Sequence, residues 1–582
     1  MRIAVALIAF VIPLLVTPAV SQTVSTQTAP APGALLPGMP PPRENRTVPQ
    51  SGTARVRGRV VATSTGSPLR RAQITLFGLE GQNTVRRTAT TDGEGRYEFK
   101  ELPAGRYNLT AGKAGYVSLQ YGQKRPFEAG TPLTIANGEN VERIDFSLPR
   151  GGVIAVRVTD DFGEPLAGAQ VQVQRYQYGT DGQRRLTFAP SGGLGIGGTD
   201  DRGEFRIFGL TPGEYIVSAS MRNPALPPTP GNPSDVNEGF SPTFYPGTIN
   251  SAEAQAITVS IADETTVQLA LIPSRLVRIS GTVVDSEGRP AAGAMLMLVS
   301  RSGSGMFSSG GGSVAADGSF AIGGVAPGEH SIDVRPVPRP GSIGGEFASV
   351  PISVSNRDIT NVRIVTGKGT TISGRVLFEG TSARSNDTTP LRVMALQSDP
   401  SRQLTFSPSD PLSNGVLDDQ GNFQVGATGR VFLSLTTPPL WVLKSITLEG
   451  DDITDTPLDL AGRSSLSGVV IRMTDKLTQV AGQVSDAKGQ LLKDCVIIVL
   501  PAEQKEPIVA ARWTRTARPD SSGRFLMRGL RPGRYVATAI ETLEQGRQFA
   551  PEFQEQLRRA AREFLVREGE SITVDLRLTP GL

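Results

Sequence analysis

Short stretches in which apolar and polar residues alternate recur along the chain from residue 55, and turns separate them. In the first copy, Tyr97 stands two positions after the turn residue Gly95, and Phe99 follows two positions later. A second turn ends at Gly105, and Tyr107 returns to the same face. A period of two is typical of a half-buried strand, so the unit predicts a turn, a strand, a second turn and a strand. The unit occurs at residues 92–107, 200–215, 318–330, 418–431 and 520–535.

Each unit lies inside a longer repeat that has the size of a domain. A copy opens with a strand such as residues 56–60 and closes with a strand such as residues 144–148. The small residues in the opening strands are roughly a hundred positions apart, which is the spacing of domains and not of a solenoid repeat. Several short strands per copy, with turns between them, indicate a two-sheet antiparallel sandwich. The small residues are Gly58, Ala155, Gly281, Gly374 and Gly482.

The sequence therefore predicts an all-β protein, a tandem array of about five antiparallel immunoglobulin-like or prealbumin-like β-sandwich domains. We call these domains modules 1 to 5. Module 4 is degenerate, because it lacks the Pro-Gly of the second turn and carries an unusual tail that begins at Trp441. The expected ranges are 53–150, 151–274, 275–367, 368–475 and 476–582.

One short helix is expected near the C-terminus, inserted in module 5 at about residues 551–564. Pro551 stands near its start, and Phe553, Leu557 and Phe564 follow at helical spacing. We expect this helix to cross between strands with its apolar face on the sandwich; a partner-binding helix is the alternative. Trp513 is expected in a basic strand, where it either stacks on a ligand or packs at an edge.

The N-terminal residues are typical of an export signal. A positive end, an apolar run at residues 3–16 and small residues at Ala19 and Ser21 predict a Sec signal peptide over residues 1–21. No cysteine follows the apolar run, so a lipoprotein anchor is not expected. Residues 22–52 are rich in Pro and are predicted to form a disordered spacer. We expect an exported protein, periplasmic or secreted, without a membrane span after cleavage.

The supply of catalytic side chains is small. The chain has one histidine, His330, and one cysteine, Cys495. The familiar zinc sites, which need several His and Cys ligands, are therefore not expected, and catalysis by a histidine base would have to use His330. His330 stands where other copies have a core tyrosine, and Cys495 lies in an apolar run, so both are expected in cores. We therefore predict no enzyme, no catalytic residue, no cofactor and no metal site, and we read the repeated Asp residues as turn residues. The near balance of 59 basic and 55 acidic residues does not favour nucleic-acid binding.

The opening G-x-V strand, the D-x-x-G-x-[FY] turn and the L-x-P-G-x-Y turn together resemble the carboxypeptidase regulatory-like domain. The resemblance covers nearly all of residues 55–580 and is weakest in module 4. It implies a transthyretin-like or prealbumin-like sandwich, related in fold to carbohydrate-binding sandwiches, in an exported bacterial protein. It implies carbohydrate or protein binding without fixing a ligand.

Exposed aromatic residues are the usual platform for sugars. The candidate ligand-binding residues are Tyr121, Tyr245 and Trp441, and Tyr116 and Phe244 also lie outside the repeat core. The alternative is that these aromatic side chains only pack against loops. We expect a non-enzymatic, extracytoplasmic, multi-domain binding protein with a polysaccharide or another envelope protein as its partner. Carbohydrate binding is the most specific form of this hypothesis, a structural spacer or protein-interaction stalk is the alternative, and a hydrolase is disfavoured.

Overall fold

Contacts divide the chain into Met1–Pro49 and Gln50–Leu582, and the computed structural model describes residues of the second unit only. The predicted signal peptide, and the predicted spacer up to residue 51, lie outside the described residues. The described residues are 52–78, 86–123, 130–189, 196–221, 238–300, 308–335, 346–382, 391–398, 414–436, 441–503, 505–520 and 522–582.

The strands of modules 1 and 2 are short and close together along the chain. Module 1 contains β1 Ala54–Ala62, β2 Gln73–Gly78, β3 Arg86–Thr90, β4 Arg96–Leu102, β5 Gly105–Gly112, β6 Leu119–Gln120, β7 Leu133–Ile135, β8 Asn140–Val141 and β9 Phe146–Leu148. Module 2 contains β10 Gly152–Thr159, β11 Gln170–Tyr178, β12 Arg184–Phe188, β13 Ile196–Gly198, β14 Glu204–Leu210, β15 Gly213–Ser220, β16 Glu238–Ser241, β17 Thr243–Phe244, the 3-10 helix η1 Ser251–Glu253, β18 Ile257–Val259, β19 Glu264–Ala270 and β20 Ile272–Arg275.

Modules 3 to 5 repeat this succession with different insertions. Module 3 contains β21 Val277–Val284, β22 Met295–Ser300, β23 Ser308–Ser313, β24 Ser319–Val325, β25 Gly328–Arg335, β26 Ala348–Val354 and β27 Ile359–Val365. Module 4 contains β28 Thr370–Glu379, β29 Arg392–Gln397, β30 Asn414–Val416, β31 Asn422–Ala427, β32 Arg430–Leu435, β33 Val442–Leu448, β34 Asp451–Asp452, β35 Leu458–Asp459 and β36 Ser465–Thr474. Module 5 contains β37 Gln479–Ser485, β38 Val496–Pro501, α1 Pro507–Trp513, β39 Arg515–Ala517, β40 Arg524–Arg528, β41 Gly533–Ile540, η3 Arg547–Phe549, α2 Pro551–Ala560, β42 Arg562–Val566, β43 Ser571–Thr573 and β44 Leu576–Arg577.

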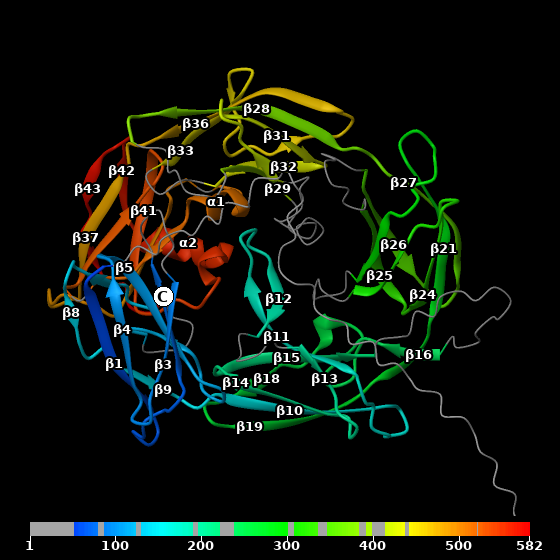
Figure 1. Ribbon diagram of the computed structural model, residues 1–582, viewed down its shortest axis with the longest axis horizontal. Coiled ribbons are helices and arrows are strands. Elements are labelled where there is room, and N and C mark those ends of the chain that lie inside the picture. Colours follow the sequence, from blue (N-terminus) through cyan, green and yellow to red (C-terminus); the bar gives the residue numbers. More distant parts are fainter. Residues whose placement is uncertain are drawn as a thin grey trace, which may run out of the picture. The chain divides into compact units, whose positions relative to one another are not determined.

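Two sheets form each module (Figure 1). Alternating apolar residues of their strands form a buried core in each module. In module 3 these sheets have the strand orders β24-β21-β27 and β23-β22-β25-β26. Module 2 adds a small two-stranded sheet, β16-β20. The pairings between described strands each join two strands of one expected module, except that β20 of module 2 runs one residue past the expected boundary, to Arg275. The predicted all-β sandwich architecture is confirmed, while the boundaries between the modules stay a prediction.

Each module contains parallel pairing, which differs from the expected antiparallel arrangement. The opening strand lies antiparallel to one neighbour, as β21 does to β24, but parallel to the closing strand of the module, as β21 does to β27. The other pairings between described named strands are antiparallel. The parallel pairs are β1 with β8 and β9, β10 with β19, β21 with β27, β28 with β36, and β37 with β43 and β44.

In four modules, the glycine of the opening strand leaves room for a carbonyl group of the closing strand that lies unusually close. A Cβ atom on Gly281 would overlap the carbonyl oxygen of Val362 in the closing strand, so no larger residue fits without a backbone shift. The parallel ladder is interrupted at the same place, between Ile279 and Gly281. The corresponding pairs of glycine and closing-strand carbonyl are Gly58 with Ile144, Gly374 with Val469, and Gly482 with Val574.

Module 2 shows the same pairing without the glycine. Ala155 stands at this position, and β10 pairs with β19 in unbroken register along the whole closing strand. Where the ladder is interrupted in modules 1 and 5, a backbone amide of the opening strand donates to an aspartate side chain of the closing segment. Arg59 N donates to Asp145 Oδ1 at 2.7 Å, and Gln483 N donates to Asp575 Oδ1 at 3.0 Å. The glycine therefore goes with a bulged closing strand, and alanine goes with a regular one.

The repeated turns have the predicted chemistry. Asp92 Oδ1 accepts from the amides of Glu94 at 2.9 Å and Arg96 at 2.8 Å, and Gly95 has a φ of 76°. Asp200, Asp418 and Asp520 make the same pair of bonds in their modules. In each of these turns the aspartate carboxylate accepts hydrogen bonds from the backbone amides of its own turn.

A buried aromatic residue stands two positions after the glycine of the second turn in four modules, and its side chain forms a hydrogen bond with an earlier backbone carbonyl group. The hydroxyl groups of Tyr107, Tyr215 and Tyr535 donate to the carbonyl oxygen four residues earlier, at 2.7, 2.6 and 3.0 Å. His330 takes this place in module 3, where it is 4% exposed and its Nε2 lies 2.9 Å from the carbonyl oxygen of Ala326. The bond requires a hydrogen on Nε2. The predicted core role of His330 is confirmed.

Two α-helices lie in the described part of module 5, one more than expected. The predicted helix begins at Pro551 but ends at Ala560, and Phe564 lies on β42 instead, stacked on Tyr535 with ring centroids 5.9 Å apart. The second helix, α1, replaces the basic strand that was expected around Trp513, which is its last residue. Among the described residues, no helix is long and apolar enough to cross a membrane.

The helix α2 explains why β38 is apolar along its whole length. Ile497 and Val499 face the sandwich core, while Val496, Ile498 and Leu500 form a second cluster with residues of α2, which lies beside β41 (Figure 1). A strand covered on both faces loses the alternation of polar and apolar residues. Cys495, just before β38, is fully buried, and burial raises the pKa of its thiol to about 11.

The close approach in the opening strand predicts a large cost for a small substitution. We expect Gly281→Ala to destabilise module 3 by about 1–3 kcal/mol, because the added methyl group overlaps backbone and not a flexible side chain. Ala155→Gly, the converse change in module 2, should cost only about 0.5–1 kcal/mol. Hydrogen exchange of β21 and β27 measures the effect, and unchanged exchange in Gly281→Ala would contradict this account of the glycine.

The buried histidine predicts a pH dependence that is confined to module 3. Burial lowers the pKa of His330, while its bond to Ala326 and the charge of Glu329 oppose the shift. Below the ordinary pKa of 6.5 the unfolded chain therefore binds more protons than the folded one. The contribution of neutral His330 to the free energy of unfolding is therefore fully present above that pH, and it decreases as the pH falls below it. His330→Tyr should remove the dependence, measured by hydrogen exchange of β25 at about pH 7.5 and about pH 5.5, on either side of the ordinary pKa.

Tyr107→His is the matched control for this experiment. It places the same ring in module 1, where the tyrosine hydroxyl bonds Pro103 in the same way. Module 1 should then gain the pH dependence that module 3 loses. Equal slopes in the wild type and both variants would show that the histidine does not titrate on unfolding.

Candidate functional site

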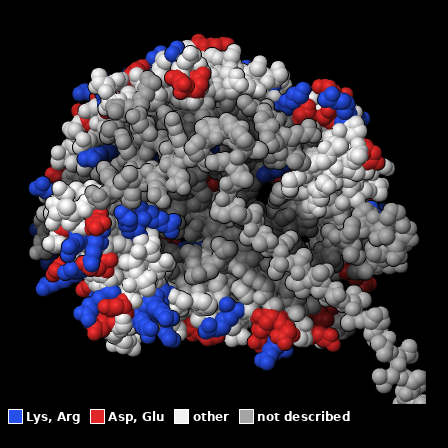
Figure 2. Space-filling model, viewed as in Figure 1, with Lys and Arg blue, Asp and Glu red and all other residues white. Residues whose placement is uncertain are grey.

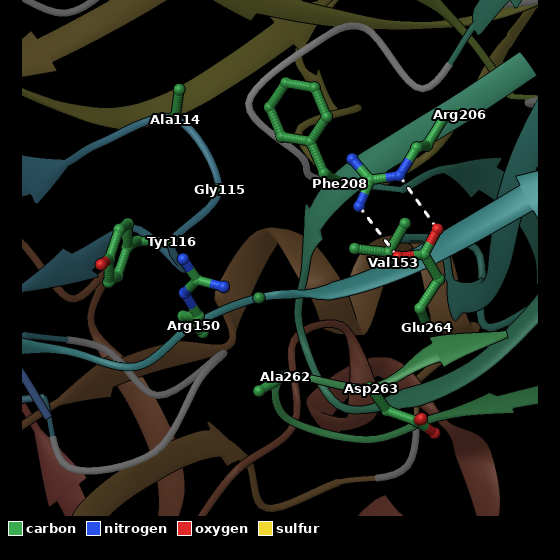
Figure 3. A pocket seen from close by; sticks show the side chains of 11 residues that line it. Ala114, Gly115, Tyr116, Arg150, Val153, Arg206, Phe208, Ala262, Asp263 and Glu264 are labelled. Atoms are coloured by element: carbon green, nitrogen blue, oxygen red, sulfur yellow. Dashed lines mark hydrogen bonds and ion pairs between the residues drawn. The ribbon is translucent and has the colours of Figure 1, made fainter. Parts of the chain in front are cut away.

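A pocket of about 420 Å³ lies where module 1 ends and module 2 begins (Figure 3). Its volume is in the range of small-molecule sites, which is roughly 300–1,000 Å³. The walls come from the loop between β5 and β6, from the link between the modules, from β14, and from the turn that leads into β19. The lining residues are Ala114, Gly115, Tyr116, Arg150, Gly151, Val153, Arg206, Phe208, Ala262, Asp263 and Glu264.

Backbone hydrogen bonds hold the link between the modules from both sides. Gly151 N donates to Gly115 O in module 1 at 3.1 Å, and Ala262 N in module 2 donates to Arg150 O at 3.2 Å. Val153 N donates to Asp263 O at 2.8 Å and anchors the turn at the base of the pocket. The pocket walls are therefore fixed by main-chain atoms.

An ion pair with two hydrogen bonds crosses one wall. Arg206 Nε donates to Glu264 Oε1 and Arg206 Nη2 donates to Glu264 Oε2, both at 3.0 Å. The two side chains lie on either side of β10, on β14 and β19, and about half of each is exposed. Hydrogen bonds from Arg206 lower the pKa of Glu264 and, in return, raise the pKa of Arg206. Glu264 is thus held as a carboxylate, which opposes a role as a proton donor near neutral pH.

Two aromatic rings add apolar surface to the charged wall. Phe208 points outward from β14 and is 39% exposed. Tyr116 is half-buried against the core of module 1, and the guanidinium carbon of Arg150 lies 6.0 Å from its ring centre. Figure 3 shows the two rings on different sides of the pocket, with the Arg206–Glu264 pair beside Phe208.

The charges of the lining residues balance. Arg150 and Arg206 oppose Asp263 and Glu264, and the lining contains no histidine, cysteine, serine or lysine. Elsewhere in the described part of the chain, no group of three His, Cys, Asp or Glu side chains is placed to hold a metal ion. On the face shown in Figure 2, basic and acidic side chains are interspersed. The arrangement can stack on a ligand and exchange hydrogen bonds with it.

The three predicted ligand-binding residues lie in three different modules and are not brought together. Tyr121 is half-buried on the core of module 1, with its ring 6.2 Å from that of Phe146. Tyr245 is half-buried on the core of module 2. Trp441 is only 2% exposed and packs edge-on against Phe378 at 4.9 Å. The expectation of an exposed platform at Trp441 is therefore wrong, because the residue fills the core of module 4.

Of the aromatic residues outside the repeat core, Tyr116 is the one that lines the pocket, whereas Phe244 is buried. Sequence reasoning missed Phe208, although a signal was present. The outward position after the second apolar residue of this strand is Lys100 in module 1, Gly323 in module 3 and Arg528 in module 5. An aromatic residue there departs from the repeat.

Three solved structures align with parts of the chain: the minor pilin GBS52 of Streptococcus agalactiae, the shaft pilin SpaA of Lactobacillus rhamnosus GG, and the major pilin subunit BcpA of Bacillus cereus. Their identities are 15%, 14% and 14%, they cover 38%, 38% and 54% of this chain and 95%, 98% and 100% of their own, and their TM-scores are 0.21, 0.20 and 0.14. Scores at this level carry no argument about a shared function.

No curated protein matches the sequence. The family model described as the carboxypeptidase regulatory-like domain matches residues 55–149, which cover the strands of module 1. Residues 55–149 are therefore identified as a carboxypeptidase regulatory-like domain, as the repeated turns and strands indicate.

Proposed function

We propose that this chain is an exported, non-enzymatic binding protein and that the pocket between modules 1 and 2 takes an uncharged sugar unit of a polysaccharide. One observation carries the proposal: Tyr116 and Phe208 offer apolar faces in a pocket whose charges balance. Sugar rings present apolar C–H faces and several hydroxyl groups, so they suit aromatic rings next to fixed donors and acceptors.

Several polar side chains of the pocket are exposed and can form hydrogen bonds with the hydroxyl groups of a ligand. Asp263 is exposed, and the Arg206–Glu264 pair leaves about half of each side chain open to a ligand. Because the two charges already neutralise each other, a hydroxyl group adds hydrogen bonds without leaving an unpaired charge. A charged ligand would have to displace one partner of this pair.

A rigid spacer of the cell envelope is the second candidate. Its support is the link between modules 1 and 2, where main-chain bonds from both sides join residues 149–151 to their neighbours. Such a link restrains bending, which a stalk requires. The two functions are compatible, and binding measurements separate them.

Removal of either pocket ring should weaken sugar binding. We expect Tyr116→Ala and Phe208→Ala each to raise the dissociation constant about fivefold, since a lost aromatic contact costs on the order of 1 kcal/mol. A glycan array with the full chain identifies the ligand, and calorimetry with that glycan measures the change.

Phe162→Ala is the matched control, because Phe162 is 86% exposed on the first turn of module 2 and does not line the pocket. Binding to Phe162→Ala should equal that of the wild type. Binding that survives both pocket substitutions, or an array without any bound glycan, rejects the sugar site and favours the spacer.

A further inference from the structure

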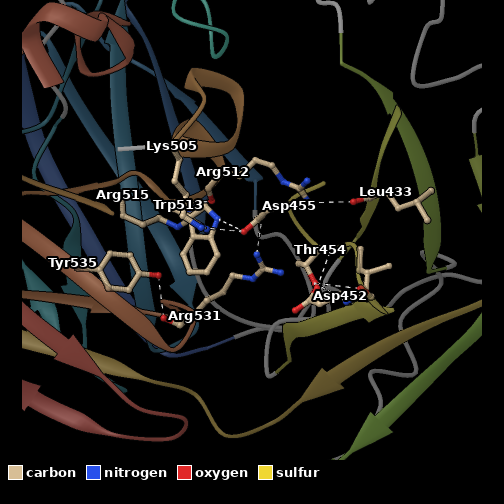
Figure 4. A network of polar contacts seen from close by, with 11 residues as sticks. Leu433, Asp452, Thr454, Asp455, Lys505, Arg512, Trp513, Arg515, Arg531 and Tyr535 are labelled. Atoms are coloured by element: carbon tan, nitrogen blue, oxygen red, sulfur yellow. Dashed lines mark hydrogen bonds and ion pairs between the residues drawn. The ribbon is translucent and has the colours of Figure 1, made fainter. Parts of the chain in front are cut away.

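A second polar cluster lies between modules 4 and 5 and, unlike the balanced pocket, it holds more positive than negative charge (Figure 4). Its centre is Asp455, on the segment between β34 and β35 that departs from the repeat. Module 5 supplies Lys505, Arg512 and Trp513 from α1 and the residues before it, and Arg531 from the turn before β41. The cluster therefore joins the irregular part of module 4 to the inserted helix of module 5.

Three module 5 side chains reach the one carboxylate. Trp513 Nε1 donates to Asp455 Oδ2 at 2.8 Å, Arg531 Nη1 donates to Asp455 Oδ1 at 3.2 Å, and Lys505 Nζ lies 3.5 Å from Oδ2. Only 21% of the Asp455 side chain and 14% of the Arg531 side chain are exposed. Charges at this depth are screened less than those on an open surface.

Positive charge exceeds negative charge around the indole. Lys505 Nζ and the guanidinium carbon of Arg531 lie 4.5 and 4.7 Å from the centre of the Trp513 ring. Arg512 adds a further cation, which lies 5.2 Å from the Phe432 ring and donates to Leu433 O at 3.1 Å. Three cations thus share one carboxylate.

Two guanidinium nitrogens in the cluster have no hydrogen-bond partner although they are buried. They are Nη1 of Arg512 and Nη2 of Arg531. Leaving a buried donor without a partner costs more free energy when the donor belongs to a charged group than when it is neutral. A bound acceptor would remove this cost. Burial lowers the pKa of Arg512, Asp455 opposes this, and the charge of Arg531 lowers it further. The two guanidinium groups therefore act on each other across the cluster.

We propose that this cluster is an anion site, in which an oxyanion group, either a small free ion or an acidic group of a polysaccharide, accepts hydrogen bonds from Arg512 and Arg531. A carboxylate, sulfate or phosphate supplies both the missing acceptors and the missing negative charge. The Lys505 side chain is 30% exposed and that of Arg531 is 14% exposed, so we expect the anion to enter from the side of Lys505.

Trp513 gives a local readout for the test. The chain has two tryptophans, so Trp441→Phe leaves Trp513 as the sole indole, and its fluorescence reports on the cluster. Sodium sulfate, sodium phosphate and sodium galacturonate are titrated into the full chain against sodium chloride at equal ionic strength. Saturable changes with the oxyanions and none with chloride support the site, and calorimetry on the wild type checks that Trp441→Phe has not altered it.

Polygalacturonate separates the two sources of the anion. Tighter binding of the polymer than of galacturonate, per carboxylate, indicates an acidic polysaccharide. Equal binding indicates a small free ion. Both results support the site, whereas a response that follows ionic strength alone overturns it.

Substitutions distinguish an anion site from a clamp between modules. Arg512→Gln and Arg531→Gln should each weaken oxyanion binding about tenfold or more, as expected for loss of a hydrogen bond to a charged group. Arg534→Gln is the matched control, since Arg534 is an exposed arginine of module 5 that pairs with Glu563 outside the cluster.

Asp455→Asn gives the decisive comparison. It removes the competing carboxylate, so oxyanions should bind more tightly, and sulfate should restore the thermal stability that the substitution removes. If Asp455 only clamps the two modules, the variant loses stability and sulfate restores no more of it than chloride does, which overturns the proposal. This comparison remains valid if the arginine variants fail to fold, and Tyr116→Ala should leave the result unchanged.

Discussion

Each module depends on the contact between the middle of its opening strand and the carbonyl groups of its closing strand. In module 3 this contact joins Gly281 to Val362, two residues from opposite ends of the module. Because the two strands are parallel, the chain enters the module at one end of the sheet and leaves it at the other. Modules built in this way are connected end to end, and the surfaces between them are made of turns, links and insertions.

The sequence predicts the parts of this architecture that depend on local chemistry. The conformations of Asp92 and Gly95 depend only on the turn in which they lie. The alternation of apolar and polar residues around Tyr97 reflects a single strand with one buried face. The role of His330 was also predictable, since its alignment with Tyr107 places it at the same bond to a carbonyl four residues earlier. These features need no knowledge of distant contacts.

The direction of the closing strand was not predictable from this pattern. A parallel and an antiparallel neighbour bury the same alternate residues, so the period of two fits both. The opening glycine marks the position of the strand, but its reason becomes visible only when the carbonyl of Val362 is placed against it. Trp441 was misjudged for a similar cause, because its burial depends on Phe378, more than sixty positions earlier in the chain.

The candidate sites occur where the repeat is broken, and this follows from the constraint on the strands. Core positions are fixed by the alternation, whereas Phe208 faces outward and Asp455 lies in an irregular segment, so both are free to differ between modules. The two sites also differ in charge balance. At the first junction Arg206 is neutralised by Glu264, which suits a ligand that brings hydroxyl groups and no charge.

At the second junction Asp455 faces more positive charge than it can neutralise, and buried donors are left without acceptors. Desolvation makes such an excess costly, so a bound anion stabilises the folded chain as well as the contact between the modules. Sandwiches of one common plan would thus acquire distinct ligand preferences through a few side chains at their junctions, because these side chains lie outside the packed cores.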